Sequence, residues 1–295
     1  MKFATVRRNG QSMVVLVEGD RVHPVNDMLD PSGGVADMLD LVRRYDEVVP
    51  HLKAAGRSGL ALSEVVIEAP IPRPFRNVMC VGKNYHEHAR EFAGSGFDSS
   101  ATSAADAVPT APIIFTKVPE CVIADGAPIR YPAGVSDGVD YEAELALVIG
   151  KGGRGITRPN ALDHVWGYTI VNDVTARDWQ GRHKQWFLGK SFDTFCPMGP
   201  WIVTADALDA ANLDVRCWVN DELRQNANTK DLIFDVPTLI ETISAGITLH
   251  PGDVIATGTP AGVGIGFKPP KFLKPGDRVR IEIAGIGTLM NSVEA

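Results

Sequence analysis

Two glutamates separated by one residue stand in the stretch Asp140-Tyr141-Glu142-Ala143-Glu144-Leu145, which leads into an apolar run that ends at Gly150. The alternation predicts a strand, in which Glu142 and Glu144 project from the same face. Neighbouring carboxylates repel each other and resist burial unless something neutralises them. A divalent cation with carboxylate ligands would do so, whereas the bare pattern also fits the solvated edge of a strand.

A third carboxylate, Asp173, follows a second apolar run at residues 165–172, which also predicts a strand. A helix-prone segment begins at Thr175, so Asp173 alone fits a helix N-cap. Beside Glu142 and Glu144 it would complete an oxygen-only site with positions left for water or substrate, which suits Mg²⁺ or Mn²⁺. No thiol or histidine in the sequence stands at zinc-finger spacing.

His88 and Glu91 stand three residues apart in a segment, residues 84–92, that predicts a short helix. At this spacing the two side chains share a helix face and can touch. A histidine held in one tautomer by a carboxylate can act as a general base. The alternative is a surface helix with an incidental ion pair.

Lys190 lies among aromatic residues, and Gly189-Lys190-Ser191 resembles the end of a phosphate-binding loop. That loop needs a glycine at position 184, which is a lysine, so we exclude it. Lys190 either extends to water or is held by carboxylates in a site. Thr257-Gly258-Thr259 ends a predicted strand and offers N–H groups and hydroxyls to an anionic ligand, or forms a simple turn. Gly262-x-Gly264-x-Gly266 lacks the context of a dinucleotide fingerprint and predicts a flexible loop.

The composition is that of an ordinary globular protein, with 44% hydrophobic and 22% charged residues among 295. The net charge of −7 argues against nucleic acid or an anionic membrane surface as the main partner. The sequence shows no signal-peptide core and no run of membrane-spanning length. Its four scattered cysteines are expected to be reduced and buried, and the expected location is the cytoplasm.

The chain is expected to divide in the segment Ala69-Pro70-Ile71-Pro72-Arg73-Pro74, because its prolines predict a stiff linker. Residues 1–72 predict a small N-terminal domain, with a strand meander that turns at Asn9-Gly10 and a helix over 35–55. Residues 73–295 predict a larger domain. Within it, the Gly-, Ser- and Ala-rich residues 93–111 predict a mobile loop, either a lid or a plain insertion.

Apolar runs alternate with Gly, Pro and Asp turns beyond residue 73, without a βαβ rhythm, which predicts a β-rich α+β fold. Asp235 followed by Pro237 predicts the start of a helix. The predicted strands cover residues 77–81, 113–116, 141–149, 165–172, 200–204, 213–219, 253–257 and 277–283, and the predicted helices 84–92, 174–184 and 236–245.

Taken together, these stretches resemble the fumarylacetoacetate hydrolase family over roughly residues 75–290. Each motif is weak alone, and the order and spacing of five make the resemblance specific. The matching motifs are Val81-Gly82-Lys83-Asn84-Tyr85 with His88 and Glu91, Tyr141-Glu142-x-Glu144-Leu145, Asn172-Asp173-Val174-Thr175-Ala176-Arg177-Asp178, Gly189-Lys190-Ser191-Phe192-Asp193, and Thr257-Gly258-Thr259-Pro260-x-Gly262-Val263-Gly264.

The resemblance implies a mixed β-sandwich roll preceded by a small N-terminal α+β domain, in a homodimer. It also implies Mg²⁺ or Mn²⁺ held by three carboxylates, and a pocket that binds a small 2-oxo or 1,3-diketo acid. The implied metal ligands are Glu142, Glu144 and Asp173; the implied catalytic residues are His88, Glu91 and Lys190; the expected substrate-binding residues are Tyr85, Arg177, Gln180, Thr257, Gly258 and Thr259.

The activity expected first is metal-dependent hydrolysis of a C–C bond in an acylpyruvate, fumarylpyruvate or 2,4-diketo-3-deoxy sugar acid, giving a 2-oxo acid such as pyruvate and a carboxylic acid. His88, oriented by Glu91, would take a proton from water, while Lys190 would stabilise the oxyanion or deliver a proton. The alternatives are decarboxylation or keto–enol isomerisation of acids such as oxaloacetate or 2-hydroxyhepta-2,4-diene-1,7-dioate. A non-catalytic ligand-binding protein is a more distant alternative.

Overall fold

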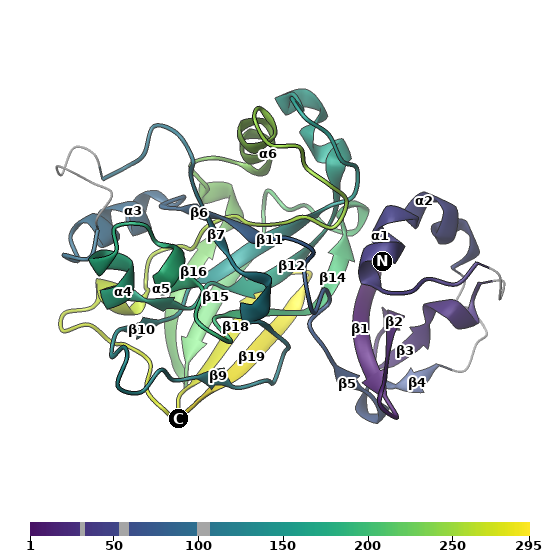
Figure 1. Ribbon diagram of the computed structural model, residues 1–295, viewed down its shortest axis with the longest axis horizontal. Helices are drawn as coiled ribbons and strands as arrows, with labels where there is room; N and C mark the ends of the chain where they lie inside the picture. Colours follow the sequence, from purple (N-terminus) through teal and green to yellow (C-terminus); the bar gives the residue numbers. More distant parts are fainter. Residues whose placement is uncertain (30–32, 53–58, 99–106) are drawn as a thin grey trace.

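The computed structural model of the protein describes residues 1–29, 33–52, 59–98 and 107–295 (Figure 1). Its largest element is a 12-stranded sheet in the order β4-β3-β2-β1-β14-β12-β11-β17-β6-β7, in which β5 pairs with β1 and β8 with β14. The strands are β1 (Lys2–Arg8), β2 (Gln11–Glu18), β3 (Arg21–Pro24), β4 (Leu60–Ala61), β5 (Val66–Ile67), β6 (Val78–Gly82), β7 (Ile113–Lys117), β8 (Val122–Ile123), β11 (Ala143–Ile149), β12 (Val165–Asn172), β14 (Cys196–Thr204) and β17 (Val254–Ala256).

A second, five-stranded sheet has the order β16-β15-β18-β19-β9, and a two-stranded ribbon pairs β10 with β13. These strands are β9 (Ile129–Arg130), β10 (Val139–Asp140), β13 (Thr175–Ala176), β15 (Asp214–Val219), β16 (Glu222–Asn228), β18 (Arg278–Ile283) and β19 (Gly287–Glu294). The helices are α1 (Met38–Arg43), α2 (Tyr45–Val48), α3 (His86–Ala93), α4 (Arg177–Arg182), α5 (Phe187–Lys190) and α6 (Val236–Ser244).

Strand β11 runs through the middle of the molecule and is buried along its whole length. Successive side chains alternate between two cores, as the period-two pattern of a strand requires. Leu145 and Leu147 pack with Ile281 of β18 in the core between the two sheets. Ala146 and Val148 face the opposite side, in a second core that includes residues of α1.

The N-terminal segment continues the large sheet, because β1 pairs antiparallel with β14 at Phe3 and Ile202. The predicted turn at Asn9-Gly10 joins β1 to β2, and both residues have positive φ, which suits these two residue types. In Figure 1 the first five strands, α1 and α2 form a lobe beside the larger body of the protein. A domain boundary at residues 72–73 remains a prediction.

Most predicted strands of the larger part are found, but β16, β19 and the two-residue strands β8, β9, β10 and β13 were not predicted. β13 lies in the first part of the helix predicted over 174–184, of which α4 is the helical part. The sequence of β16, ELRQNAN, has few apolar residues, so hydrophobic periodicity gives it no signal. The helix predicted over 35–55 is instead α1, α2 and a 3₁₀ turn at Val49–His51, and its last three residues lie outside the described part. Of the loop predicted over 93–111, residues 99–106 also lie outside the described residues.

Candidate active site

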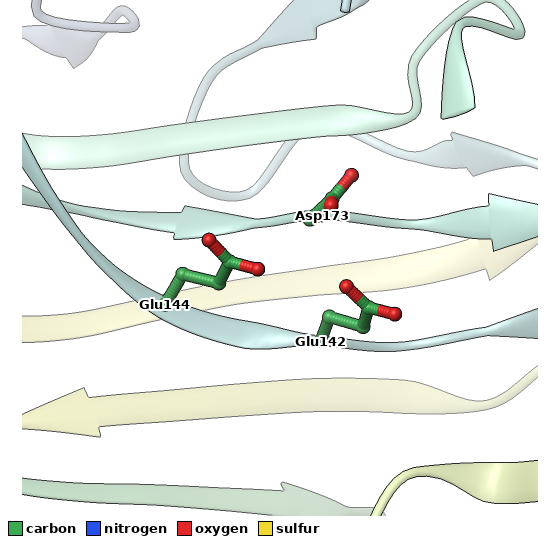
Figure 2. Close-up of side chains that lie close together, drawn as sticks. All are labelled: Glu142, Glu144 and Asp173. Atoms are coloured by element: carbon green, nitrogen blue, oxygen red, sulfur yellow. The ribbon is translucent and has the colours of Figure 1, made fainter. Parts of the chain in front are cut away.

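Glu142, Glu144 and Asp173 converge on one point: each offers an oxygen, and these oxygens lie within 4.8 Å of one another. Figure 2 shows the two glutamates side by side on one stretch of chain and Asp173 on the neighbouring one. All three residues are buried, with exposed fractions of 4%, 1% and 0%. The wet strand edge allowed by the sequence is therefore wrong.

Pairing between β11 and β12 brings the three carboxylates together, since Ala143 lies opposite Asn172 in the register. Just beyond this pair, the Asp173 N–H donates to the Glu142 carbonyl at 2.9 Å, and the Asn172 side chain accepts from the Glu142 N–H at 3.0 Å. The N-cap of α4 is Ala176, so Asp173 is not a helix cap. Its carboxylate is left for the site.

Two buried lysines contact the carboxylates and play different parts. The Lys190 Nζ donates to Glu142 at 2.8 Å and to Asp173 at 2.6 Å. The Lys117 Nζ contacts Asp173 at 2.6 Å and also the carbonyl oxygens of Val174 and Lys190. Three acceptors use all three N–H bonds of Lys117, which makes it a brace between the segments that carry Asp173 and Lys190.

Glu144 is the carboxylate that stays unneutralised. Within the described part of the chain no Lys, Arg or His forms an ion pair with it, and the Gly258 N–H donates to it at 2.8 Å. Burial and the charges of Asp173 and Glu142 raise the pKa of Glu144 well above its usual range.

The donor set therefore fits a divalent cation. It consists of converging carboxylate oxygens, the ligands that hard cations prefer, and it retains a negative charge that the neighbouring lysines do not balance. Glu142, Glu144 and Asp173 are the residues that would hold Mg²⁺ or Mn²⁺. The Lys190 ammonium donates to two of them, Glu142 and Asp173.

Arg177 links the carboxylates to the wall of the pocket. Its guanidinium donates to Asp140 at 2.9 Å, to Glu142 at 2.7 Å and to the Gln180 side chain at 3.1 Å. Although burial opposes ionisation, the charges of Lys190 and Arg177 hold the pKa of Glu142 well below its usual range. Among the described residues the Nη2 atom of Arg177 is buried and has no hydrogen-bond partner, so its two N–H bonds are left over.

His88 and Glu91 form the predicted pair on one face of α3, with His88 Nδ1 3.3 Å from the Glu91 carboxylate. The Gly262 N–H also donates to Glu91, at 3.1 Å and 3.2 Å to its two oxygens. Because Nδ1 faces Glu91, the lone pair of a neutral His88 lies on Nε2. His86, on the same helix, is exposed.

The glycine-rich loop at residues 262–266 is packed and hydrogen bonded. The N–H groups of Gly264 and Ile265 donate to Asp140 at 2.6 Å and 3.1 Å. A Cβ atom at Gly266 would lie 1.7 Å from a Glu91 oxygen. The loop thus needs glycine for close approach to two carboxylates, and the flexibility predicted for it stays a prediction.

Of the three carboxylates, Glu142 lines a small pocket with a cavity volume of about 10 Å³, the space of roughly one water molecule. Binding a larger molecule therefore requires side chains to move. Basic and aromatic side chains dominate the wall. The lining residues are Val81, Gly82, Lys83, His88, Phe92, Phe115, Glu142, Arg177, Gln180, Trp186, Lys190 and Thr259.

Three of the six residues predicted to bind substrate line this pocket, and the other three lie elsewhere. Arg177, Gln180 and Thr259 line the pocket. Gly258 instead holds Glu144, while the Thr257 hydroxyl donates to the Leu145 carbonyl at 2.9 Å. Tyr85 lines a separate hollow beside His86 and Glu87.

Several residues of the site could not be recognised as functional from the sequence alone. Lys83 belongs to a motif that was recognised, but its role had no signal of its own. Lys117 and Asp140 stand at the ends of short strands and become informative only once their partners are known. Phe92, Phe115 and Trp186 resemble ordinary core residues in the sequence.

Comparison with known proteins identifies the family. The fumarylacetoacetate (FAA) hydrolase C-terminal family matches residues 77–294. The oxaloacetate tautomerase YisK of Bacillus subtilis is 52% identical over 234 residues, which cover 79% of this chain and 74% of that protein.

Two solved structures share the fold across the whole chain. Fumarylacetoacetate hydrolase from Exiguobacterium antarcticum has a TM-score of 0.86 and 41% identity, covering 100% of this chain and 99% of its own. Maleylpyruvate hydrolase from Sphingobium sp. SYK-6, in complex with manganese(II) and pyruvate, has a TM-score of 0.80 and 35% identity with the same coverage. The protein belongs to the fumarylacetoacetate hydrolase family.

Proposed function

We propose that the protein is a divalent-metal-dependent keto–enol tautomerase of oxaloacetate or a closely similar 2-oxo acid. The observation that carries this proposal is the placement of a histidine base, His88, and a cationic donor, Lys190, in one pocket with Glu142, one of the three converging carboxylates. The 52% identity to an oxaloacetate tautomerase supports isomerisation over the hydrolysis expected first from the sequence.

The reaction moves one proton between C3 and the oxygen on C2, and no carbon–carbon bond breaks. A Mg²⁺ or Mn²⁺ ion at the carboxylates would supply Lewis-acid stabilisation of the charge on the 2-oxo oxygen. His88 Nε2 removes the C3 proton of the keto form and returns it in the reverse direction. Glu91, held by the Gly262 N–H, stabilises the imidazolium that forms. Lys190 donates a hydrogen bond to the 2-oxo oxygen, which takes a proton from solvent, while the His88 imidazolium releases the C3 proton to solvent, so that no net proton is gained or lost.

Substituting the base tests this assignment. His88→Ala should lower the rate of enol–keto conversion by about 10²–10⁴-fold, the usual contribution of a positioned base, and leave Mn²⁺ affinity unchanged. His86→Ala is the matched control, because His86 is exposed on the same helix and should retain the full rate. Stopped-flow absorbance of the enol gives the rate and calorimetry gives the affinity. Equal rates for wild type and His88→Ala would remove His88 from the mechanism.

C–C hydrolysis of an acylpyruvate is the second candidate, supported by the structural likeness to maleylpyruvate hydrolase. It would use the same carboxylates and base, but His88 would activate a water that attacks the distant carbonyl. Product analysis separates the two reactions, since hydrolysis alone yields two carbon fragments with oxygen from solvent. A panel of acylpyruvates beside oxaloacetate makes this comparison in one assay.

A further inference from the structure

Lys83 is a fourth basic side chain at the pocket, beside His88, Arg177 and Lys190. It follows Gly82, the last residue of β6, with φ of 56°, a left-handed conformation that a lysine rarely adopts. Such conformations persist where the surroundings enforce them, and they cluster at functional sites. The backbone at Lys83 is therefore shaped for its position at the pocket wall.

The next residue, Asn84, enforces this turn. Its side chain donates to the carbonyl oxygens of Phe234 at 2.9 Å and Thr257 at 2.7 Å, and accepts from the Phe234 N–H at 2.8 Å. Asn84 is fully buried. These bonds tie the turn to two other segments, so Lys83 is presented to the pocket by a rigid support.

The Lys83 ammonium is buried against a carboxylate. Its Nζ lies 2.6 Å from the Asp98 carboxylate, and the two side chains are only 2% and 3% exposed. It also lies 5.8 Å from the centroid of the Phe92 ring, and the Arg177 guanidinium carbon lies at the same distance from that ring. Lys83 and Arg177 thus both contact Phe92 and line the same pocket, and Arg177 pairs with Glu142.

We propose that Lys83 binds the second carboxylate of a dicarboxylic 2-oxo acid, and that Asp98 holds this position until the substrate arrives. The proposal rests on the proposed function and specifies its substrate class. Exchange of one carboxylate for another keeps the buried ammonium neutralised, and the displaced Asp98 carboxylate must turn toward solvent. Glu142, Glu144 and Asp173 would hold the metal that binds the 2-oxo end of the substrate. A substrate with one carboxylate has no second carboxylate for Lys83 to bind.

The test compares oxaloacetate, which has two carboxylates, with pyruvate, which has one, on the full-length Mn²⁺-loaded protein. Calorimetry gives the affinity for each acid, and inhibition of turnover by pyruvate gives a second measure. Lys83→Met should weaken oxaloacetate binding by about 10–100-fold, as expected for a lost hydrogen bond to a charged group, and change pyruvate binding less than about twofold. Lys274→Met, at an exposed lysine, is the control and should change neither.

Asp98→Asn gives an independent prediction of opposite sign. Removing the competing carboxylate should tighten oxaloacetate binding and leave pyruvate unchanged. Equal losses for both acids in Lys83→Met, or a loss of oxaloacetate affinity in Asp98→Asn, would overturn the proposal; Asp98→Asn decides it if Lys83→Met does not fold. Since the affinities do not depend on turnover, a protein that selects oxaloacetate but does not tautomerise it would refute the proposed function alone.

Discussion

At the residue scale, the site is a set of buried charges that do not cancel among themselves. Two of the three carboxylates, Glu142 and Asp173, form ion pairs with two lysines and Arg177, and Arg177 also forms an ion pair with Asp140. In the part of the chain that the structure describes, Glu144 is left with one hydrogen-bond donor, the Gly258 N–H. A buried carboxylate in this position destabilises the protein when ionised, unless a cation binds beside it.

Glu144→Gln should therefore separate metal binding from stability. We expect the affinity for Mn²⁺ to fall by at least about tenfold, because a charged ligand is lost, while the melting temperature of the metal-free protein rises. Calorimetry and thermal unfolding measure the two effects. Unchanged Mn²⁺ affinity would exclude Glu144 as a ligand.

The raised pKa of Glu144 also predicts how the stability and the metal affinity of the protein depend on pH. The folded metal-free protein holds the proton more tightly than the unfolded chain, so its stability is greatest below the unfolded pKa and is lost as pH rises toward the folded pKa. Metal must displace this proton, so Mn²⁺ affinity should rise with pH over the same range. Titrations at several pH values with wild type and Glu144→Gln check this, and an equal slope in both would contradict it.

Lys117 should contribute stability through its three buried acceptors. Lys117→Met leaves Asp173 without one partner and two carbonyls without a donor, and we expect a loss of about 3 kcal/mol or more in the free energy of unfolding. Chemical denaturation measures it, with the exposed-site variant Lys274→Met as control. A change below about 0.5 kcal/mol would show that Lys117 is not a brace.

Some of the contacts between residues of the site could be predicted from the sequence. The spacing of Glu142 and Glu144 places both on one strand face, and His88 with Glu91 follows from helix periodicity. The partners of Lys117 and Lys83 could not be predicted, because each contact joins segments more than ten residues apart. Only the folded chain brings them together.

At the scale of elements, the site is held by the ends of strands and by the glycine-rich loop. Residues 140–144 lead into β11, Asp173 follows β12, and residues 262–266 close over Glu91 and Asp140. The strands were predictable from their apolar runs. The packing of the loop was not, because glycines that permit close approach and glycines that permit flexibility look alike in sequence.

Gly266→Ala tests this arrangement. Its Cβ would occupy the place of the Glu91 carboxylate, so we expect kcat to fall at least about tenfold as His88 loses its orientation, with Mn²⁺ affinity unchanged. Gly246→Ala is the matched control, because a Cβ there meets nothing within 4 Å. Full activity in Gly266→Ala would show that Glu91 does not need this position.

At the scale of the whole molecule, two sheets enclose a core around β11, and the carboxylates at β11 and β12 lie beside α4 and α5, because Glu142 pairs with Arg177 and Lys190. The fold class was predictable from strand-rich patterning together with the family resemblance. The pairing of β1 with β14 was not, because it joins residues about 200 positions apart. No helix among the described residues combines the length and apolar character needed to cross a membrane, and the homodimer remains a prediction.

The central claim is metal-dependent tautomerisation, and the most direct measurement follows enol-oxaloacetate by absorbance while proton NMR identifies the product. Chelator-treated protein should lose its rate, Mg²⁺ or Mn²⁺ should restore it above the rate with metal alone, and keto-oxaloacetate should be the sole product. Pyruvate released together with carbon dioxide, or a rate that neither chelator nor metal alters, would contradict the account.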